Sequence, residues 1–482
     1  MTMCSVEDCN FEERQDGLCI LHCKKSDYHG DFLKAGFLND FYAKLLAYIQ
    51  QHDSQNKLMF VEIAFPGRDD RDSFDYSELL ERLEDAHFFD CSFESFNMNL
   101  EGVKCFFDGC IFRGFTQLHD FDMLNNYHSV LFQDCEFGGN VNLTPVEGGV
   151  NTVNNNLFLD CTFEKQLAVE NLIFNAQLFL NSGSKVVSLQ SFRLQDCTFK
   201  DKFGLNCCSL ENFYAFRILF EEKFEFKDSM ADVYAINDCN FGKLSDFHGS
   251  KFGDFSIFKS EFRDFVGFEN CVFGKNESAE NNAAVFEYTT FMSFVNFRTT
   301  EFVSGLDLEK INLKEPPNFL RSSVNLKNTN RETFRIIKHS FDQIGNVIEA
   351  NKYFVYEMIK YKEELRGTDR KQEKFVFYLN DYISKFGQSY IRPMLWLIAM
   401  STLYYAIIHG CVSKCMSLIV PPLHQVCTLV APYLNAWAKC ISPFNNVNVL
   451  EDGLEFISLV FYVIFTVLVW QTVVAIKRHV KR

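Results

Sequence analysis

Residues 226–262 read FKDSMADVYAINDCNFGKLSDFHGSKFGDFSIFKSEF, and this stretch decides the fold. Apolar side chains recur there in steps of five, in two runs: Phe226, Ala231, Ile236 and Phe241, then Phe247, Phe252, Ile257 and Phe262. A small residue, Cys239, stands two positions before Phe241. A period of five matches neither the 3.6-residue period of an α-helix nor the two-residue period of a β-strand.

The same step extends over residues 88–313. Pairs of phenylalanines five residues apart mark it: Phe88/Phe93, Phe107/Phe112, Phe132/Phe137 and Phe158/Phe163. Cysteines, most of them two positions before an apolar residue of the step, mark it as well: Cys91, Cys105, Cys110, Cys135, Cys161, Cys197, Cys239 and Cys271. The pattern predicts a coil with four flat sides, in which each side turns two side chains inward and three outward. Such coils of about twenty residues pair edge to edge at the spacing of neighbouring strands and bury a core only by stacking. About eleven coils are expected.

These residues resemble the pentapeptide-repeat family, whose members fold as right-handed quadrilateral β-helices. The step slips at 113–128, 138–157, 181–188 and 274–285, which are rich in Asn, Gly or Ser and are expected to be loops at coil corners. The expected fold class is therefore mainly a β solenoid, joined to a helical linker, two transmembrane helices and a small N-terminal Cys/His zinc knuckle. A fold of this kind does not name a function.

The totals bound the organisation. The chain has 482 residues, 55 of them Phe, and a net charge of −16. We expect five parts: a knuckle (1–30), an α/β cap (31–87), the β-helix (88–313), a helical linker with an interfacial helix (314–390) and a transmembrane hairpin (391–482). The negative net charge argues against nonspecific nucleic-acid binding. It is consistent either with a solvated acidic outer wall of the solenoid or with a DNA-like surface, such as some soluble pentapeptide-repeat proteins present.

Cysteine usage indicates a reducing compartment. The chain has 18 cysteines, no N-terminal signal peptide is recognised, and most cysteines occupy the small inward position of the repeat. We interpret these as reduced thiols in a cytosolic solenoid.

Residues 4–23, CSVEDCNFEERQDGLCILHC, contain two groups of possible metal ligands. Cys4 and Cys9 precede a polar turn, and Cys19, His22 and Cys23 follow it. This pattern predicts a tetrahedral structural zinc site, with the fourth ligand open between His22 and Cys23. Free cysteines that cap the following helix are the alternative. Similar short Cys/His knuckles precede some pentapeptide-repeat membrane proteins.

Flanking segments have helical or strand patterns. Residues 31–50 predict an amphipathic helix, 58–66 a strand and 76–86 a short helix, which together would cap the open edge of the solenoid. After Pro316-Pro317, two helices are predicted at 330–344 and 346–365, and an interfacial helix at 371–387, where aromatic residues mix with lysines.

Two membrane spans are predicted, at about 393–410 and 454–476. Basic residues gather outside their connecting loop, 411–453, in the flank before the first span (Arg366, Arg370, Lys371, Lys374, Lys385, Arg392) and in the tail (Lys477, Arg478, Lys481, Arg482). The positive-inside rule then places both termini in the cytoplasm. The resemblance to bacterial pentapeptide-repeat membrane proteins implies that the membrane is the bacterial inner membrane. The loop cysteines Cys411, Cys415, Cys427 and Cys440 would face an oxidising compartment and could pair.

No catalytic constellation is recognised, so we do not expect an enzyme. Ser458, Tyr462 and Thr466 share one face of the second span. They are candidates for lining a pore, and hydrogen bonding between helices is the alternative. The loop has no T-x-G-Y-G-like filter, although some pentapeptide-repeat membrane proteins carry a pair of spans similar to a potassium-channel pore module.

The first functional hypothesis is a homo-oligomeric membrane channel or membrane effector. Its cytosolic solenoid would sense a ligand or partner, and a nucleotide or oligonucleotide signal would fit the resemblance to two-span effectors of antiphage defence. The alternative is a membrane-tethered scaffold whose solenoid binds a protein partner and whose spans only anchor it in the lipid bilayer. A DNA-mimicking inhibitor is a third, weaker hypothesis.

Overall fold

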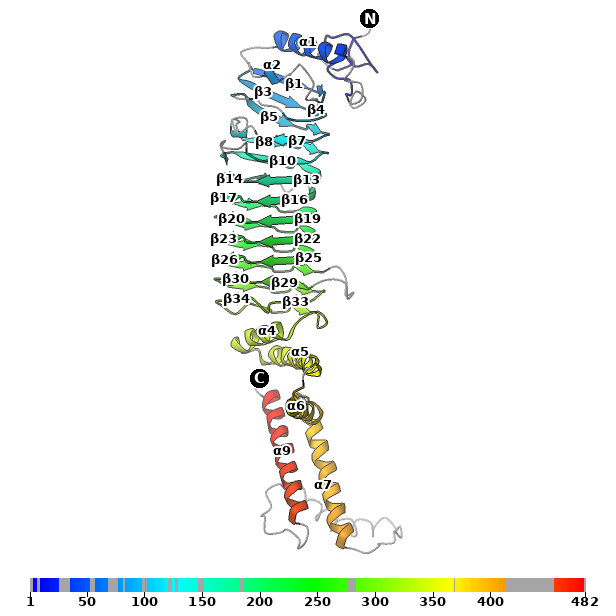
Figure 1. Ribbon diagram of the computed structural model, residues 1–482, viewed down its shortest axis with the longest axis vertical. Coiled ribbons are helices and arrows are strands. Elements are labelled where there is room, and N and C mark those ends of the chain that lie inside the picture. The colour runs from blue at the N-terminus through cyan, green and yellow to red at the C-terminus, as the bar shows by residue number, and fades with distance from the viewer. Residues whose placement is uncertain are drawn as a thin grey trace. The chain divides into compact units, whose positions relative to one another are not determined.

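The structure is a computed structural model, and it describes these residues: 3–6, 9–25, 35–52, 57–67, 77–80, 83–97, 100, 102–119, 124–125, 129–145, 151–181, 186–274, 283–367, 369–412 and 455–480. The chain divides into two compact units, Met1–Ile336 and Ile337–Arg482 (Figure 1). The first unit is a β-solenoid of about ten turns with the N-terminal Cys/His segment and helices α1 (Ala35–His52) and α2 (Ser77–Leu80).

All paired strands in the solenoid are parallel, and they form four sheets. The largest contains β2 (Ala64–Phe65), β4 (Ser92–Phe93), β6 (Ile111–Phe112), β7 (Thr116–Leu118), β9 (Glu136–Phe137), β10 (Val141–Leu143), β13 (Thr162–Glu170), β16 (Val187–Gln195), β19 (Cys208–Phe216), β22 (Met230–Asn237), β25 (Lys251–Phe258), β28 (Val272–Phe273), β29 (Ala284–Glu287), β32 (Glu301–Phe302), β33 (Leu306–Asp307) and β35 (Ser323–Val324). Because long strands such as β16 and β19 bend across a corner, this sheet covers two sides of each coil.

The other three sheets form the remaining two sides. One side consists of β11 (Thr152–Val153), β14 (Ile173–Phe174), β17 (Thr198–Phe199), β20 (Leu219–Phe220), β23 (Asn240–Phe241), β26 (Glu261–Phe262), β30 (Thr290–Phe291) and β34 (Asn312–Leu313). The last side is divided between β1 (Lys57–Val61), β3 (Asp85–Phe89), β5 (Lys104–Asp108), β8 (Val130–Gln133), β12 (Asn156–Leu159) and β15 (Phe179–Leu180), and then β18 (Phe203–Gly204), β21 (Phe224–Glu225), β24 (Ser245–Asp246), β27 (Val266–Gly267) and β31 (Val295–Asn296).

The most regular coils, from β16 to β28, are 21 residues long rather than twenty. The reason is one longer side. On the other sides two outward residues separate one inward pair from the next, but Lys200, Asp201 and Lys202 all lie between the buried rings of Phe199 and Phe203. The solenoid therefore combines three five-residue sides with one six-residue side in each of these coils.

Asp-Cys and Asn-Cys pairs mark the coil corners. The residue before the small inward side chain adopts a left-handed backbone at Asp90, Asp134, Asp160, Asp196, Asp238 and Asn270, with φ between 51° and 57°. Asp and Asn accept this conformation more readily than most residues with a Cβ atom. At five of these six corners the cysteine thiol that follows donates to a carbonyl of the preceding coil, as from Cys135 Sγ to Phe107 O at 3.5 Å, whereas Cys239 donates to Asn237 O. These thiols act as corner donors as well as small apolar groups.

Stacked phenylalanines fill the centre of the solenoid. The Phe93, Phe112 and Phe137 rings lie 4.9 and 4.7 Å apart between centroids, in nearly parallel planes. Neighbouring columns meet edge to face, as Phe107 and Phe112 do at 5.8 Å. Both geometries are favourable for aromatic pairs.

The observed solenoid extends beyond the expected range of 88–313. The strand expected at 58–66 is observed as β1 and β2, but β1 pairs in register with β3 and β2 with β4, so this segment is solenoid and not a separate cap. The helix expected at 76–86 is observed at Ser77–Leu80, and its expected C-terminal bound is wrong because Asp85 and Ala86 belong to β3. At the other end β35 pairs with β32.

Helices form the second unit, with α4 (Arg331–Gln343) crossing the boundary between the units. The others are α5 (Val347–Arg366), α6 (Lys371–Ser384), α7 (Ile391–Val412) and α9 (Glu455–Val480), close to the expected ranges. Asn346 caps α5 by accepting from the Glu349 N–H at 3.3 Å, and α7 packs along α9.

Among the described residues, one helix is long and apolar enough to cross a membrane, at Leu459–Arg478 of α9. The described apolar part of α7, Ile391–Ile407, is shorter. The expectation of two spans is therefore matched for one helix only. The expected loop 411–453 lies outside the described residues beyond Val412, as do the cysteine pairs predicted within it, and nothing is described of the Cys411 side chain.

Candidate functional site

Four of the five predicted metal ligands converge at the N-terminus. The ligand atoms of Cys4, Cys9, Cys19 and His22 all lie within 4.8 Å of one another. Cys9 Sγ is 3.6 Å from Cys19 Sγ, and His22 Nδ1 is 3.2 Å from Cys19 Sγ and 3.3 Å from Cys4 Sγ. Zinc bonds of about 2.3 Å to sulfur and 2.0 Å to nitrogen separate tetrahedral ligands by roughly 3.4–3.8 Å. The observed spacings are close to these values.

A hairpin and a short turn bring the two ligand groups together. Asp16 and Gly17 have φ values of 52° and 81°, as a two-residue hairpin turn requires. The Cys4 N–H donates to Phe11 O at 3.0 Å, and the Cys19 N–H donates to Cys4 Sγ at 3.3 Å. The backbone therefore holds Cys4 against Cys19 without help from a metal.

The structure distinguishes the two candidates for the fourth position. His22 points its Nδ1 into the cluster, whereas the Cys23 thiol lies outside it, 3.8 Å from Ile20 O. Lys25 is buried beside Cys23, and its ammonium group donates to Cys23 O at 2.6 Å and Leu21 O at 3.3 Å. Cys23 is thus part of the packing beneath the cluster.

Protonation in the cluster is set mainly by burial. Burial lowers the pKa of His22 to about 4, so its ring is neutral at pH 7 and can offer a lone pair. Burial raises the pKa of Cys9 to about 12 and also raises the pKa of Cys19. At Cys4 burial acts upward, but hydrogen bonds from the backbone of Val6 and Cys19 outweigh it and the pKa is lowered. A bound cation would stabilise the thiolates and so lower the pKa of the thiols, which would release their protons.

This donor set fits a structural metal site. Three thiols and one imidazole are a ligand set of structural zinc, and four protein ligands leave no position open for a substrate. Zinc held by Cys4, Cys9, Cys19 and His22 would stabilise the fold of the knuckle. A backbone hydrogen bond joins the knuckle to the solenoid, since the Ala64 N–H of β2 donates to Leu21 O at 2.9 Å.

The pore candidates lie on α9. Tyr462 and Thr466 are exposed on the same face of this single chain, and the Thr466 hydroxyl donates to Tyr462 O at 2.8 Å. The adjoining face packs on α7, where the Tyr404 ring lies 4.9 Å from Phe461 and 6.0 Å from Phe465. Ser458 lies in α9, but its side chain is not among those that the structure describes.

Sequence reasoning missed a polar link between α6 and α9. Gln471 of α9 donates to Asn380 Oδ1 at 2.8 Å and accepts from the Ser384 hydroxyl at 2.9 Å. Arg478 donates to Phe386 O just after α6, and its guanidinium lies 4.6 Å above the Phe354 ring of α5. The polar residue Gln471 inside an apolar span was the available signal for this contact.

A second missed feature is an ionic cluster on the outer wall. Glu225 of β21 is covered by the amines of Lys202, Lys223 and Lys227, with Lys202 Nζ 2.6 Å and Lys227 Nζ 3.2 Å from its oxygens. Asn206 also donates to this carboxylate, at 3.0 Å. Burial raises the pKa of Glu225, but the hydrogen bonds from the lysines and Asn206 outweigh it and hold the pKa well below the usual range.

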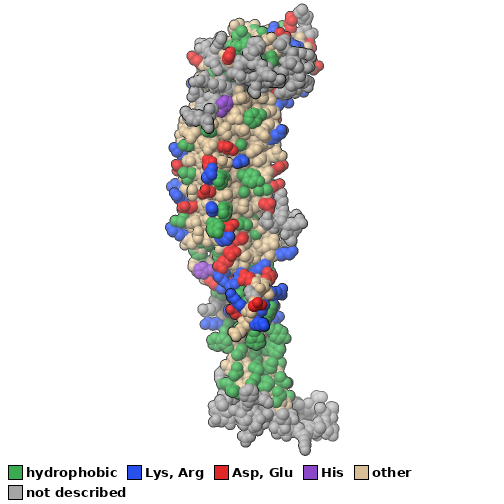
Figure 2. Space-filling view, viewed as in Figure 1, with side chains coloured by type: hydrophobic (Ala, Val, Ile, Leu, Met, Phe, Trp, Pro, Cys, Tyr) green, Lys and Arg blue, Asp and Glu red, His purple; other side chains and the backbone are tan. Residues whose placement is uncertain are grey.

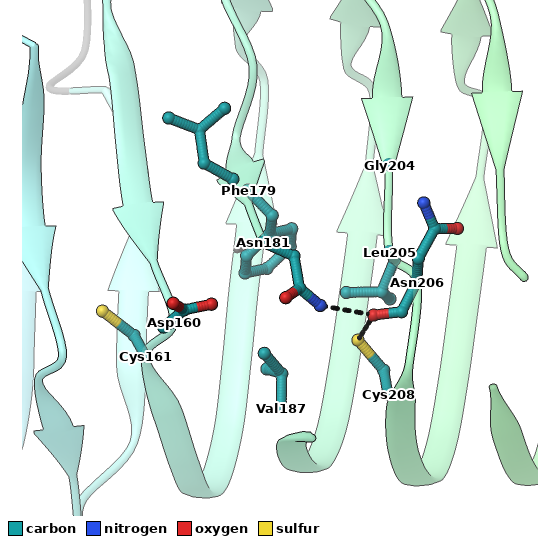
Figure 3. A pocket seen from close by; sticks show the side chains of 10 residues that line it. Asp160, Cys161, Phe179, Asn181, Val187, Gly204, Leu205, Asn206 and Cys208 are labelled. Carbon is teal, nitrogen blue, oxygen red and sulfur yellow. Dashed lines mark hydrogen bonds between the residues drawn. The ribbon is translucent and has the colours of Figure 1, made fainter. Parts of the chain in front are cut away.

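Figure 3 shows a small cavity where the divided side of the solenoid changes from β15 to β18. The Asn181 side chain donates to Asn206 O at 2.6 Å, and Cys208 donates to the same oxygen at 3.2 Å. The cavity is about 10 Å³, which is enough for one water molecule and too small for an organic ligand. The cavity marks the place where one sheet of this side ends and the next begins, and it is not a substrate site.

Comparisons with protein-family models, curated proteins and solved structures find no match to this chain.

Proposed function

We propose that this chain is a bacterial pentapeptide-repeat membrane protein in which α7 and α9 both cross the inner membrane. In this proposal the solenoid and both termini are cytoplasmic, and several copies assemble into a channel or membrane effector. The repeat supports the family proposal, since the five-residue step, the inward phenylalanines and the small corner residues all recur in the coils.

One observation carries the oligomer proposal, namely the uncovered face of α9. Within the described part of one chain, only 22% of the apolar window in Leu459–Arg478 is buried, because α6 and α7 cover a limited part of its surface. Tyr462 and Thr466 lie on the uncovered part. Polar groups within a membrane favour another helix or water over acyl chains. Further copies would cover the apolar part of this face and enclose the hydroxyl groups.

The contacts of α5 suggest how a change in the cytosolic part would reach the spans. Tyr361 of α5 meets the Phe377 ring of α6 at 5.2 Å, and Phe354 meets Arg478 at the end of α9. Movement of α5 would therefore act on α6 and α9 together. A nucleotide or oligonucleotide signal of the antiphage kind is our gating hypothesis, by analogy with bacterial two-span effectors.

The second candidate function is a membrane-tethered interaction scaffold. The closed ligand set of Cys4, Cys9, Cys19 and His22 favours it, because a site of this kind stabilises a surface and does no chemistry. In that case the solenoid would bind a protein partner and the helices would only anchor it.

Planar-bilayer conductance of the purified full-length protein separates the two functions. A channel gives discrete current steps whose size changes in Thr466→Val, which removes one hydroxyl group at nearly constant volume. Val467→Thr, which adds a hydroxyl on the neighbouring flank of α9, is the matched control and should leave the steps unchanged. Silent bilayers together with a monomer after cross-linking would support the scaffold instead.

A further inference from the structure

Helix α6 has two faces of opposite character. Phe377 and Ser384 are buried on one face. Phe375, Leu379 and Tyr382 form an exposed stripe on the other, and the Phe375 side chain is 69% exposed. Val376 and Tyr378 widen this stripe and are exposed as well. Aromatic and aliphatic side chains in such an arrangement are typical of a helix that lies along a boundary between water and an apolar phase.

The charges of this region are also divided between the two faces. Asp381 pairs with Lys362 of α5 at 2.6 Å, and Glu373 pairs with Arg370 at 3.3 Å, so the carboxylates are engaged on the side of α5. Helical spacing places Lys371 beside Phe375. Lys374 lies one turn before Tyr378, but its ammonium group donates to Arg366 O at the end of α5, at 3.4 Å. Lys385 follows at the C-terminal end. Lysines therefore border the exposed apolar stripe.

A tight turn fixes α6 at one end of α9. Lys385, Phe386 and Gly387 have φ values of 46°, 56° and 78°, three successive left-handed residues. This conformation is unusual for a bulky residue such as Phe386. It is held because the Phe386 ring packs on Phe377 at 4.6 Å and its carbonyl accepts from Arg478. The chain turns there from α6 into α7.

The exposed stripe lies on the side of α6 that is directed toward α7. The Tyr382 ring lies 5.2 Å from Trp396 of α7, whereas the opposite face of α6 meets Tyr361 of α5. In Figure 1 the axis of α6 points toward the viewer while α7 and α9 run along the picture. In Figure 2 hydrophobic side chains cover the visible face of the α7–α9 pair, and charged side chains gather at the end where α5 and α6 lie.

We propose that α6 lies in the plane of the membrane and binds anionic phospholipid headgroups of the leaflet at the C-terminal end of α9. Lys371 and Lys385 contact the phosphates, and Phe375, Leu379 and Tyr382 lie among the upper parts of the acyl chains. The inference rests on the proposed function only in that α9 spans the membrane. A second copy is a poorer occupant of the stripe, because symmetric pairing would bring the same lysines together.

Depth-dependent quenching of tryptophan fluorescence tests this inference on the full-length protein in vesicles. Trp396, Trp437 and Trp470 are replaced by Phe, and one tryptophan is then introduced as Phe375→Trp or, as the matched control on the side of α5, Glu373→Trp. A third variant keeps Trp470 alone. The vesicles contain phosphatidylcholine with brominated acyl chains, with or without phosphatidylglycerol.

We expect bromine to quench the tryptophan at position 375 but not the one at position 373, and the quenching at 375 to increase with phosphatidylglycerol. Replacing Lys371 and Lys385 by Gln should abolish that increase. If Trp470 is quenched and position 375 is not, α9 is inserted and the inference about α6 is wrong. If neither is quenched, the spanning role of α9 fails together with it. Quenching at 375 that is the same with and without phosphatidylglycerol would overturn the headgroup site.

Discussion

The solenoid and the α6–α9 region differ in how many of their large apolar side chains they expose. In the solenoid Phe252 is 2% exposed and charged side chains cover the outer wall. In the helical region Phe375 and Trp470 are exposed, at 69% and 66%, as are Leu459 and Val463. Burial normally follows hydrophobicity in water, and the reverse order is expected where lipid replaces water. The difference supports different surroundings for the two regions.

The largest effect is expected at the knuckle, whose interior uses neither aromatic stacking nor lipid. Cys19→Ser should abolish binding of one zinc ion, because structural zinc contributes about 10–16 kcal/mol of apparent binding free energy in small zinc domains. Cys23→Ser is the control and should retain the metal, since its thiol lies outside the cluster. The measurement is metal content after gel filtration. Retention of zinc by Cys19→Ser, or its loss from Cys23→Ser, would contradict the assigned ligand set.

The next largest effect compares two rings directly. Phe252→Ala should lower the free energy of unfolding by about 3–5 kcal/mol, because the ring packs against Phe226, Phe255 and Phe273 at 5.7, 4.9 and 5.1 Å. Phe375→Ala, which removes an exposed ring, should change it by no more than about 0.5 kcal/mol in detergent. Denaturant unfolding measures both. Equal losses would remove the distinction between the two regions.

The sequence predicts the coil well because each inward position must be occupied by an apolar or small side chain that stacks on its neighbours in the adjacent coils. The step of five in Phe247, Phe252 and Ile257 locates buried side chains without any long-range information. The six-residue side is harder to recognise, since the extra residue in Lys200–Lys202 is polar and resembles a surface loop. The segment of β1 and β2 carries the step only once, in Phe60 and Phe65, and its place in the solenoid becomes evident from the pairing of β1 with β3.

The metal site could be predicted less completely. The spacing of Cys4, Cys9 and Cys19 indicates three ligands, but His22 and Cys23 both follow Cys19 within one turn. Their N–H groups both donate to Cys19 O, at 3.2 and 2.9 Å, so local chain geometry favours neither. The choice depends on side-chain packing around Lys25, which the sequence does not reveal.

A medium effect is expected at Glu225, the covered carboxylate on the solenoid wall. Glu225→Gln should cost about 2 kcal/mol of stability at pH 7, because the hydrogen bonds from Lys202, Lys223 and Lys227 lose their ionic character. The lowered pKa means that this contribution is present above the usual Glu pKa of about 4.3 and is lost as the pH falls further.

The measurement for Glu225 is the free energy of unfolding between neutral pH and about pH 3. The difference between the natural protein and Glu225→Gln should shrink as the pH falls below the usual Glu pKa. Glu261→Gln is the control, since its carboxylate lies on the exposed wall beside Arg263 alone. A difference that stays constant over this range would show that the lysines do not hold Glu225 ionised.

The smallest effect tests the polar interior of the helical region. Gln471→Leu removes the hydrogen bonds to Asn380 and Ser384, and side-chain bonds of this kind contribute on average about 0.6 kcal/mol in membranes. Thr472→Val is the control, because the Thr472 hydroxyl bonds only within its own helix, to Leu468 O at 2.8 Å. Hydrogen exchange of α6 in vesicles should increase in Gln471→Leu and stay unchanged in Thr472→Val. If both variants exchange alike, α6 is held by its apolar contacts and the turn at 385–387, and the buried polar residues of this region do not position it.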